Sequence, residues 1–380
     1  MRKTTNYKRQ AILFIVIFSA ILSCRSQQTD SEDRKDDKKN NVKVGTWYFG
    51  GWSFPPEDAA GHTFHISPTL VKDYAYREPI WGWREDSYET MVEQINYATN
   101  GGLSFWGFCW YENSLVPAPK LMDNLNNALD IFLKAPNRNN LDFFVLSCHP
   151  VSQENWGKVC DRTIALFKEP NYLKVDGKPI MVFFNTDDVI SGMGGVAGVK
   201  DALRQYREKA REQGLGEILI GARTRPMGSD PRFQDKYKDC GFDFLTTYQN
   251  ADDGRKHADV NDYKNLIQGD KKAWKEISEN TDLPYVPTMG VGYDMRPWAQ
   301  DHPTIPASDY WYNQATPAEI ATHLRDAITW TKKNSAKVLD NLLFIYAWNE
   351  NGEGGWLTPT KAEGTARLDA IREVIQEQKK

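Results

Sequence analysis

Residues 85–111 read EDSYETMVEQINYATNGGLSFWGFCWY and contain one complete helix–strand unit. The first part, 85–102, is amphipathic and ends in Gly101-Gly102, which is typical of a helix stop. The second part, 103–111, is a nearly continuous apolar run, which indicates a strand covered on both faces. A helix that leads into a buried strand is the repeating unit of parallel α/β folds.

The same alternation continues through the chain from residue 42 onward. Repeated about eight times, it predicts an α/β protein with a (β/α)8 TIM-type barrel. A doubly wound open sheet is the alternative, but neither GxGxxG nor GxxxxGK[ST] occurs to support nucleotide binding. The other predicted strands are 44–49, 141–148, 179–184, 216–222, 242–248, 284–292 and 342–348. The other predicted helices are 120–135, 152–168, 198–214, 259–280, 316–334 and 363–380, with a less clear one near 230–240.

The N-terminus has the pattern of an export signal. Residues 1–9 hold four basic residues, and 11–22 form an apolar run that is too short for a comfortable membrane span. Ile21-Leu22-Ser23-Cys24 resembles a bacterial lipobox, which implies a lipoprotein signal peptide over 1–23 and lipidation of Cys24. An ordinary signal peptide followed by a chance cysteine is the alternative.

Residues 25–41 contain no apolar side chain, so they cannot offset the entropy of ordering and are expected to form a flexible tether. The predicted organisation is therefore a signal peptide (1–23), a lipidated cysteine with its tether (24–41), and one barrel domain (42–380). This organisation predicts a protein of the cell envelope, anchored in the outer membrane by lipid.

Composition restricts the class of ligand. Lys plus Arg is 47 and Asp plus Glu is 51, a net charge of -4 that argues against nucleic acid as the main partner. Removal of 1–23 would lower the net charge to -8, which suits a neutral or cationic ligand better than a polyanion. The chain also has 13 Trp, 17 Tyr and 17 Phe, and such rings are what proteins stack on sugars.

The remaining cysteines show no metal-type spacing and no disulfide framework, so buried thiols are expected. Oxygen ligands at regular spacing are also lacking, and we expect no obligatory metal and no cofactor. The cysteines concerned are Cys109, Cys148, Cys160 and Cys240.

Candidate site residues follow the predicted strands, because a barrel places its active site at the carboxyl ends of its strands. The strongest candidates are Glu350 and Glu353, since glycoside cleavage normally uses two carboxyl groups. A solvated acidic loop is the alternative. His149 could equally be structural, and Asp294 could simply pair with Arg296. The candidate substrate-binding residues are Tyr48, Trp52, Trp110, Tyr111, His149, Asn185, Tyr248, Tyr293, Asp294, Asn349 and Trp356.

Several motifs together resemble the glycoside hydrolase family 99-like proteins, a group that includes the WbsX-type proteins of polysaccharide loci. The resemblance runs in order from about residue 44 to residue 375. The motifs are Trp47 to Trp52 (WYFGGW), Arg77 with Pro79 and Gly82, Glu93-Gln94-Ile95, Phe105 to Tyr111, Tyr172 to Pro179 (YLKVDGKP), and Ala347 to Gly354 (AWNENGEG) with Pro359.

The resemblance implies a (β/α)8 barrel and an enzyme that cleaves α-mannosidic links with retention. In that family the sugar's own 2-hydroxyl attacks the anomeric carbon. Carried over, Glu350 would assist the 2-hydroxyl, Glu353 would be the general acid and base, and Tyr48 would line the reacting sugar. The family's Trp after the first Glu is Asn351 here, which is a departure that bears on the sugar preference.

We therefore predict an envelope-anchored retaining glycoside hydrolase that acts on an α-linked polysaccharide or glycan, for which the resemblance suggests an α-mannosidic link. One alternative is a glycosyltransferase-like protein, as WbsX-type members have been labelled. The export signal argues against this alternative, because nucleotide-sugar donors are cytoplasmic. The other alternative is a non-catalytic glycan-binding lipoprotein on the same barrel.

Overall fold

The computed structural model describes residues 41–114, 119–226, 235–304 and 309–378. The chain divides into Met1–Asn41 and Val42–Lys380, and nearly all of the first unit lies outside the described residues. The predicted signal peptide, Cys24 and the tether up to residue 40 therefore remain predictions. None of the helices in the described ranges is both long and apolar enough to cross a membrane.

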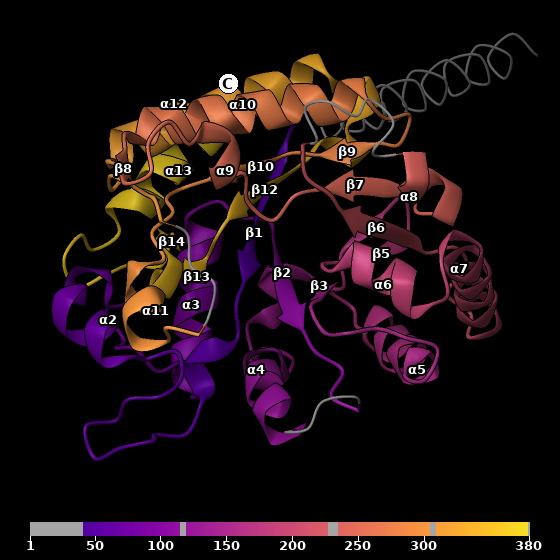
Figure 1. Ribbon diagram of the computed structural model, residues 1–380, viewed down its shortest axis with the longest axis horizontal. Coiled ribbons are helices and arrows are strands. Elements are labelled where there is room, and N and C mark those ends of the chain that lie inside the picture. Colours follow the sequence, from indigo (N-terminus) through magenta and orange to yellow (C-terminus); the bar gives the residue numbers. More distant parts are fainter. Residues whose placement is uncertain (1–40, 115–118, 227–234, 305–308, 379–380) are drawn as a thin grey trace, which may run out of the picture. The chain divides into compact units, whose positions relative to one another are not determined.

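Parallel strands form a nearly closed barrel, which confirms the predicted (β/α)8 fold (Figure 1). Their order around the barrel is β10-β12-β1-β2-β3-β5-β6-β7-β9. Each predicted apolar run contributes to this barrel. The strands are β1 (Lys43–Tyr48), β2 (Phe105–Trp110), β3 (Asp142–Ser147), β5 (Lys178–Phe183), β6 (Leu219–Arg223), β7 (Phe244–Thr246), β9 (Tyr285–Val286), β10 (Thr288–Gly290) and β12 (Leu342–Tyr346).

The predicted strand 284–292 is divided in two by Pro287. Proline has no backbone N–H for the ladder, and the two halves pair with different neighbours: β9 with β7, and β10 with β12. Two hydrogen bonds connect the neighbouring strands to the chain at this break. Thr246 Oγ1 donates to the carbonyl of Val286 at 2.9 Å, and Phe344 N donates to the carbonyl of Pro287 at 3.0 Å.

Three short pairings lie outside the barrel. Strand β4 (Lys174–Val175) is antiparallel to β5, and β8 (Val260–Asn261) is parallel to β11 (Trp311–Tyr312). Beyond β12, strands β13 (Asn349–Glu350) and β14 (Gly355–Trp356) form an antiparallel hairpin. This hairpin carries both predicted catalytic glutamates.

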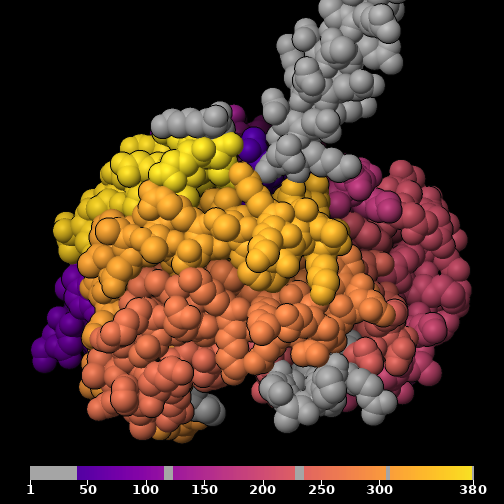
Figure 2. All heavy atoms as spheres, turned by 90° about the horizontal axis from the view of Figure 1, so that it is seen from above, coloured from indigo at the N-terminus to yellow at the C-terminus, as the bar shows by residue number. Residues whose placement is uncertain are grey.

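Helices surround the strands, and α10, α12 and α13 run together across one side (Figure 1). In Figure 2 this C-terminal, orange-to-yellow part of the chain covers most of the face shown. The helices are α2 (Pro68–Asp73), α3 (Tyr88–Asn100), α4 (Pro119–Phe132), α5 (Trp156–Phe167), α6 (Thr186–Gly192), α7 (Val196–Glu212), α8 (Asp235–Cys240), α9 (Ala251–Gly254), α10 (Tyr263–Glu279), α11 (Arg296–Asp301), α12 (Pro317–Lys333) and α13 (Ala366–Glu377).

Aromatic rings fill the centre of the barrel. The Trp47 ring lies 4.5 Å from the Phe344 ring and 5.5 Å from the Phe144 ring, measured between centroids. Glycine makes room for them: a Cβ on Gly107 would lie 2.6 Å from the Phe144 ring. Part of the tryptophan excess is therefore core packing rather than sugar binding. The thiols of Cys109, Cys160 and Cys240 are free and buried, and that of Cys148 is free and half-buried.

Candidate active site

The two predicted catalytic glutamates lie at the carboxyl end of β12, on the β13–β14 hairpin. The turn between these strands depends on Gly354, which has a φ of 81°. A Cβ there would lie 2.7 Å from the backbone nitrogen of Asp294, which donates to the Glu353 carbonyl at 2.6 Å. This close approach fixes the hairpin against the segment that follows β10.

Glu350 is buried, with 5% of its surface exposed. Its Oε1 accepts a hydrogen bond from the Tyr248 hydroxyl at 2.5 Å. Burial raises the pKa of Glu350 well above its usual range, and repulsion from Glu353 raises it further. The Cys109 thiol and the Tyr111 hydroxyl also lie close enough to Glu350 to interact with its charge. Two of the predicted binding residues, Tyr111 and Tyr248, are therefore near Glu350.

Glu353 is half-buried, and its Oε2 accepts a hydrogen bond from the Tyr346 hydroxyl at 2.5 Å. Burial raises the pKa of Glu353, and the Tyr346 hydrogen bond opposes that rise. Since the two carboxyl groups repel each other, the pair loses its protons in two separate steps. Between those steps it holds one acid and one carboxylate.

Asn349 belongs to a buried network behind this pair. Its Nδ2 donates to Glu85 Oε2 at 2.8 Å, and the Tyr48 hydroxyl donates to the same oxygen at 2.9 Å. Trp52 Nε1 donates to the Asn349 carbonyl at 2.9 Å. Burial raises the pKa of Glu85 to about 7. Tyr48 is fully buried, so in this structure its hydroxyl serves Glu85 rather than an open surface.

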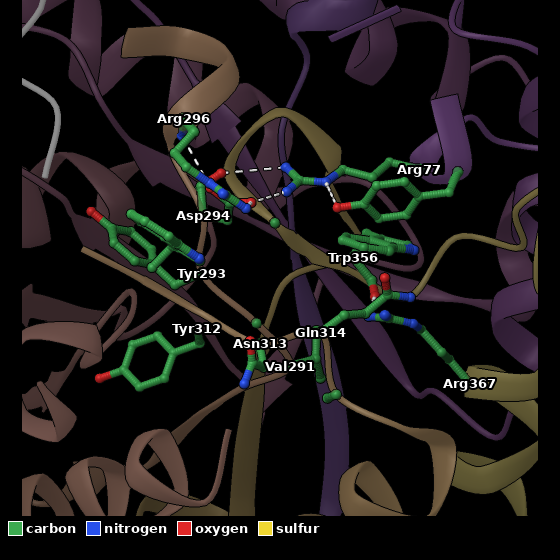
Figure 3. A pocket seen from close by; sticks show the side chains of 15 residues that line it. Arg77, Val291, Tyr293, Asp294, Arg296, Tyr312, Asn313, Gln314, Trp356 and Arg367 are labelled. Carbon is green, nitrogen blue, oxygen red and sulfur yellow. Dashed lines mark hydrogen bonds and ion pairs between the residues drawn. The ribbon is translucent and has the colours of Figure 1, made fainter. Parts of the chain in front are cut away.

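Asp294 pairs with arginines from two segments. Arg77 Nη2 forms an ion pair with Oδ2, and Arg296 Nε donates to Oδ1 at 2.8 Å (Figure 3). The Arg77 guanidinium also donates to the carbonyl of Asn351 at 3.2 Å, and Asn351 Nδ2 donates to the carbonyl of Arg77 at 2.7 Å. The predicted pairing of Asp294 with Arg296 therefore exists. Asn351, at the position of the family's Trp, is buried and anchors the hairpin.

Tyr293, Asp294 and Trp356 line one polar cavity beside the hairpin (Figure 3). Trp356 is 2% exposed, and the Arg367 guanidinium lies 3.9 Å from the centroid of its ring. These three predicted binding residues are therefore grouped, although Asp294 already has two arginine partners.

The other predicted binding residues lie elsewhere on this end of the barrel. Trp110 and His149 contact each other, with ring centroids 5.1 Å apart, and both are buried. Burial lowers the pKa of His149 to about 4, so the imidazole is neutral at pH 7. Asn185 lines a second cavity together with Arg223.

Sequence reasoning missed two residues of the site. Tyr346, the partner of Glu353, is hidden inside the apolar run that predicts β12. Glu85, the partner of Asn349, precedes a helix and looks like an ordinary polar residue there. The only available signal for Glu85 is its place in an aromatic segment, Trp81-Gly82-Trp83-Arg84-Glu85. Within the described ranges, no cluster of three or more His, Cys, Asp or Glu residues could hold a metal ion.

Comparison of the sequence with protein families matches residues 134–371 to the family described as "Glycosyltransferase WbsX". Among individual proteins, the chain is 24% identical over 218 residues to WxcX of two Xanthomonas campestris pv. campestris strains, which is described as uncharacterized. That match covers 55% of this chain and 28% of WxcX, so the chain spans less than a third of that relative.

Solved structures show the same fold at low identity. One is a GH99 endo-alpha-mannosidase from Bacteroides thetaiotaomicron, with a TM-score of 0.61 and 13% identity, covering 88% of this chain and 97% of that one. Another is described as a glycoside hydrolase-like protein, with a TM-score of 0.60 and 14% identity, covering 88% and 94%. At such identity these neighbours establish the barrel architecture.

Proposed function

The chain belongs to the WbsX family, and we propose that it is a retaining glycoside hydrolase that cleaves α-linked polysaccharide or glycan. The observation that carries the proposal is the carboxyl pair at the end of β12. Glu350 and Glu353 repel each other, each accepts a tyrosine hydroxyl, and both have raised pKa values. Such a pair supplies one proton donor and one base in the pH range between its two ionisations, which is what cleavage of a glycosidic bond requires.

In the proposed mechanism, Glu350 takes the proton of the sugar's 2-hydroxyl as that oxygen attacks the anomeric carbon. Glu353 gives its proton to the leaving oxygen in the same step. Glu353, now a carboxylate, then takes a proton from water, whose oxygen opens the three-membered ring at the anomeric carbon, while the Glu350 carboxyl returns its proton to the released 2-oxygen. Two inversions give overall retention, and both glutamates return to their starting protonation states.

The tyrosines support these roles. A hydroxyl that donates to a carboxylate stabilises its ionised form. Tyr248 thereby helps Glu350 to act as a base despite its burial, and Tyr346 keeps the pKa of Glu353 from rising so far that its proton cannot be released. The two glutamates and two tyrosines together would transfer the protons of the reaction. The buried hydrogen bonds of Glu85 with Asn349 and Tyr48 hold the start of the β13–β14 hairpin in place.

The likeness to an endo-alpha-mannosidase favours an α-mannosidic link as the first to test. We also propose that the mature protein is held at the outer membrane by lipid on Cys24. This placement would bring the barrel to a polysaccharide at the cell surface. Metabolic labelling with a radioactive fatty acid, compared between the wild type and Cys24→Ser, tests the anchor.

The test of function is the release of reducing ends from purified α-mannan and a panel of other α-linked polysaccharides. Glu350→Gln and Glu353→Gln should each lose about 10² to 10⁴ of the rate. With a glycosyl fluoride, whose leaving group needs no proton, Glu353→Gln should regain cleavage and Glu350→Gln should not. Glu208→Gln, on the exposed face of α7, is the matched control. Full activity of Glu353→Gln on the polysaccharide would refute its role.

The family's description favours a second candidate, a glycosyltransferase. In that case the carboxyl end of the barrel around Glu350 and Glu353 would bind a sugar donor with a nucleoside diphosphate leaving group. Calorimetry with nucleotide sugars distinguishes the two, because saturable binding of a donor, with transfer to an acceptor glycan, would replace hydrolysis as the function.

A further inference from the structure

Arg223, at the carboxyl end of β6, forms no ion pair with any residue that the structure describes. No carboxylate of the described residues lies within ion-pair distance of it, whereas Arg77, Arg296 and Arg367 each contact one. Its Nε is buried and has no hydrogen-bond partner. The guanidinium instead lies 4.3 Å from the centroid of the Phe184 ring. A largely desolvated cation that forms no ion pair lowers the free energy of unfolding. A role in binding a ligand would explain why it is kept at this position.

This arginine faces a cavity of about 230 Å³. Because Nε is buried while the residue as a whole is half-buried, the terminal nitrogens are the part that can reach a ligand. Asp187, also on the lining, is held by Lys236 at 2.8 Å, and Asp188 is exposed at the rim. The remaining lining residues are Phe184, Asn185, Thr186, Thr224, Arg225 and Tyr237.

The cavity adjoins the proposed catalytic pair. The Phe184 ring, on which Arg223 rests, contacts the Tyr248 ring at 5.1 Å between centroids. Tyr248 in turn donates to Glu350. The side chains of Phe184 and Tyr248 therefore connect the cavity to Glu350.

We infer that this cavity is a subsite for an acidic sugar, and that Arg223 binds the carboxylate of a hexuronic acid unit in the glycan. The inference rests on the proposed function and names its substrate class. A planar guanidinium matches a carboxylate in geometry and charge, and a bound carboxylate would supply the partner that Arg223 lacks. The charges on the lining do not oppose an anion, because Asp187 is paired with Lys236 at 2.8 Å, and Arg225 balances Asp188. Surface charges further away are screened by salt.

Binding of single sugars tests the subsite without any need for cleavage. Calorimetry on the full chain compares D-glucuronate and D-galacturonate with D-glucose and with neutral D-glucuronamide. The charged sugars should bind at least about tenfold tighter than the neutral ones, which is about 1.4 kcal/mol. Arg223→Gln should reduce that preference to about twofold or less. Arg204→Gln, on the exposed face of α7, should leave it unchanged.

The comparison of glucuronate with glucuronamide needs no variant, so it decides the matter even if Arg223→Gln fails to fold. Equal binding of the two would overturn the inference. An unchanged preference in a folded Arg223→Gln protein would also overturn it. Tighter binding of glucose 6-sulfate or glucose 6-phosphate than of glucuronate would reject the carboxylate as the ligand group.

Cleavage is then measured on a uronate-containing polysaccharide and on its carboxyl-reduced form. A preference for glucuronate without cleavage of any polysaccharide would keep the acidic subsite and reject the hydrolase. Cleavage of neutral polysaccharides with no preference for glucuronate would keep the hydrolase and reject the subsite. The hydrolase activity and the acidic subsite can therefore be refuted independently of each other.

Discussion

Replacement of Glu85 by Gln should make the protein more stable at alkaline pH. Glu85 is 2% exposed, and its Oε2 accepts from both the Tyr48 hydroxyl and Asn349 Nδ2. The other oxygen, Oε1, is buried without a hydrogen-bond partner. A glutamine can place its carbonyl oxygen where Oε2 lies and its amide where Oε1 lies. The variant therefore keeps the accepted hydrogen bonds and removes the buried charge.

The size of the effect follows from the pKa. Burial raises the pKa of Glu85 from 4.5 to about 7, a shift of about 2.5 units, or about 3 kcal/mol. Between these two values the folded protein keeps a proton that the unfolded chain has released, so rising pH favours unfolding. The stability that the protonated Glu85 provides is complete below about pH 4.5 and is lost as the pH rises through about 7.

The assay is urea unfolding of the wild type and Glu85→Gln at about pH 5 and about pH 8. The free energy of unfolding of the variant, minus that of the wild type, should rise by about 2.5 kcal/mol between these conditions, because the unfolded chain has already released part of its proton at pH 5. Glu208→Gln, on the exposed face of α7, is the control for the loss of a carboxylate outside the buried network. A constant difference for Glu85→Gln would refute the reasoning, because Glu85 would then be ionised in the fold at both pH values.

Three further predictions concern the site, the barrel and a helix cap. Tyr346→Phe removes the hydrogen bond that lowers the pKa of Glu353, so the alkaline limb of the pH–rate profile should move to higher pH. An unmoved limb would argue against Glu353 as the acid. Gly107→Ala should cost about 1–3 kcal/mol of stability in urea unfolding, because its Cβ would lie 2.6 Å from the Phe144 ring. Gly157→Ala, at a helical site with open space, is its matched control and should stabilise slightly; equal effects would contradict the packing argument. Thr316→Ala breaks the capping box with Glu319 and should cost about 1 kcal/mol by the same measurement, whereas no loss would show that the cap is dispensable.

Most of the barrel could be predicted because its strands are buried on both faces. Such burial requires continuous apolar runs, and these stand out in a sequence without any knowledge of partners. The predictions were less accurate where a distant partner decides the structure. The helix expected from residue 259 begins at Tyr263, because Val260–Asn261 pairs instead with Trp311–Tyr312. No local pattern contains that information.

The candidate site could be predicted only in part, for the same reason. The spacing of Glu350 and Glu353 after an apolar run indicated a carboxyl pair, and Tyr248 was predicted to bind substrate at the same end of the barrel. Glu85 could not be connected with Asn349, since 264 residues separate them along the chain. Trp110 and His149 share the predicted end of the barrel, but the structure groups them with each other rather than with Glu350.

The contacts that hold the β13–β14 hairpin in place restrict which amino-acid substitutions this protein can accept during evolution. Asn351 and Arg77 each bind the other's backbone carbonyl, and Asn351 also contacts Thr358 Oγ1 at 3.1 Å. Because Arg77 holds Asp294 as well, a change at any one of these positions disturbs several contacts at once. In a set of related sequences these four positions should therefore change together, as alternative sets. A lone substitution of Asn351 by a bulky residue such as Trp should be selected against unless its partners change with it.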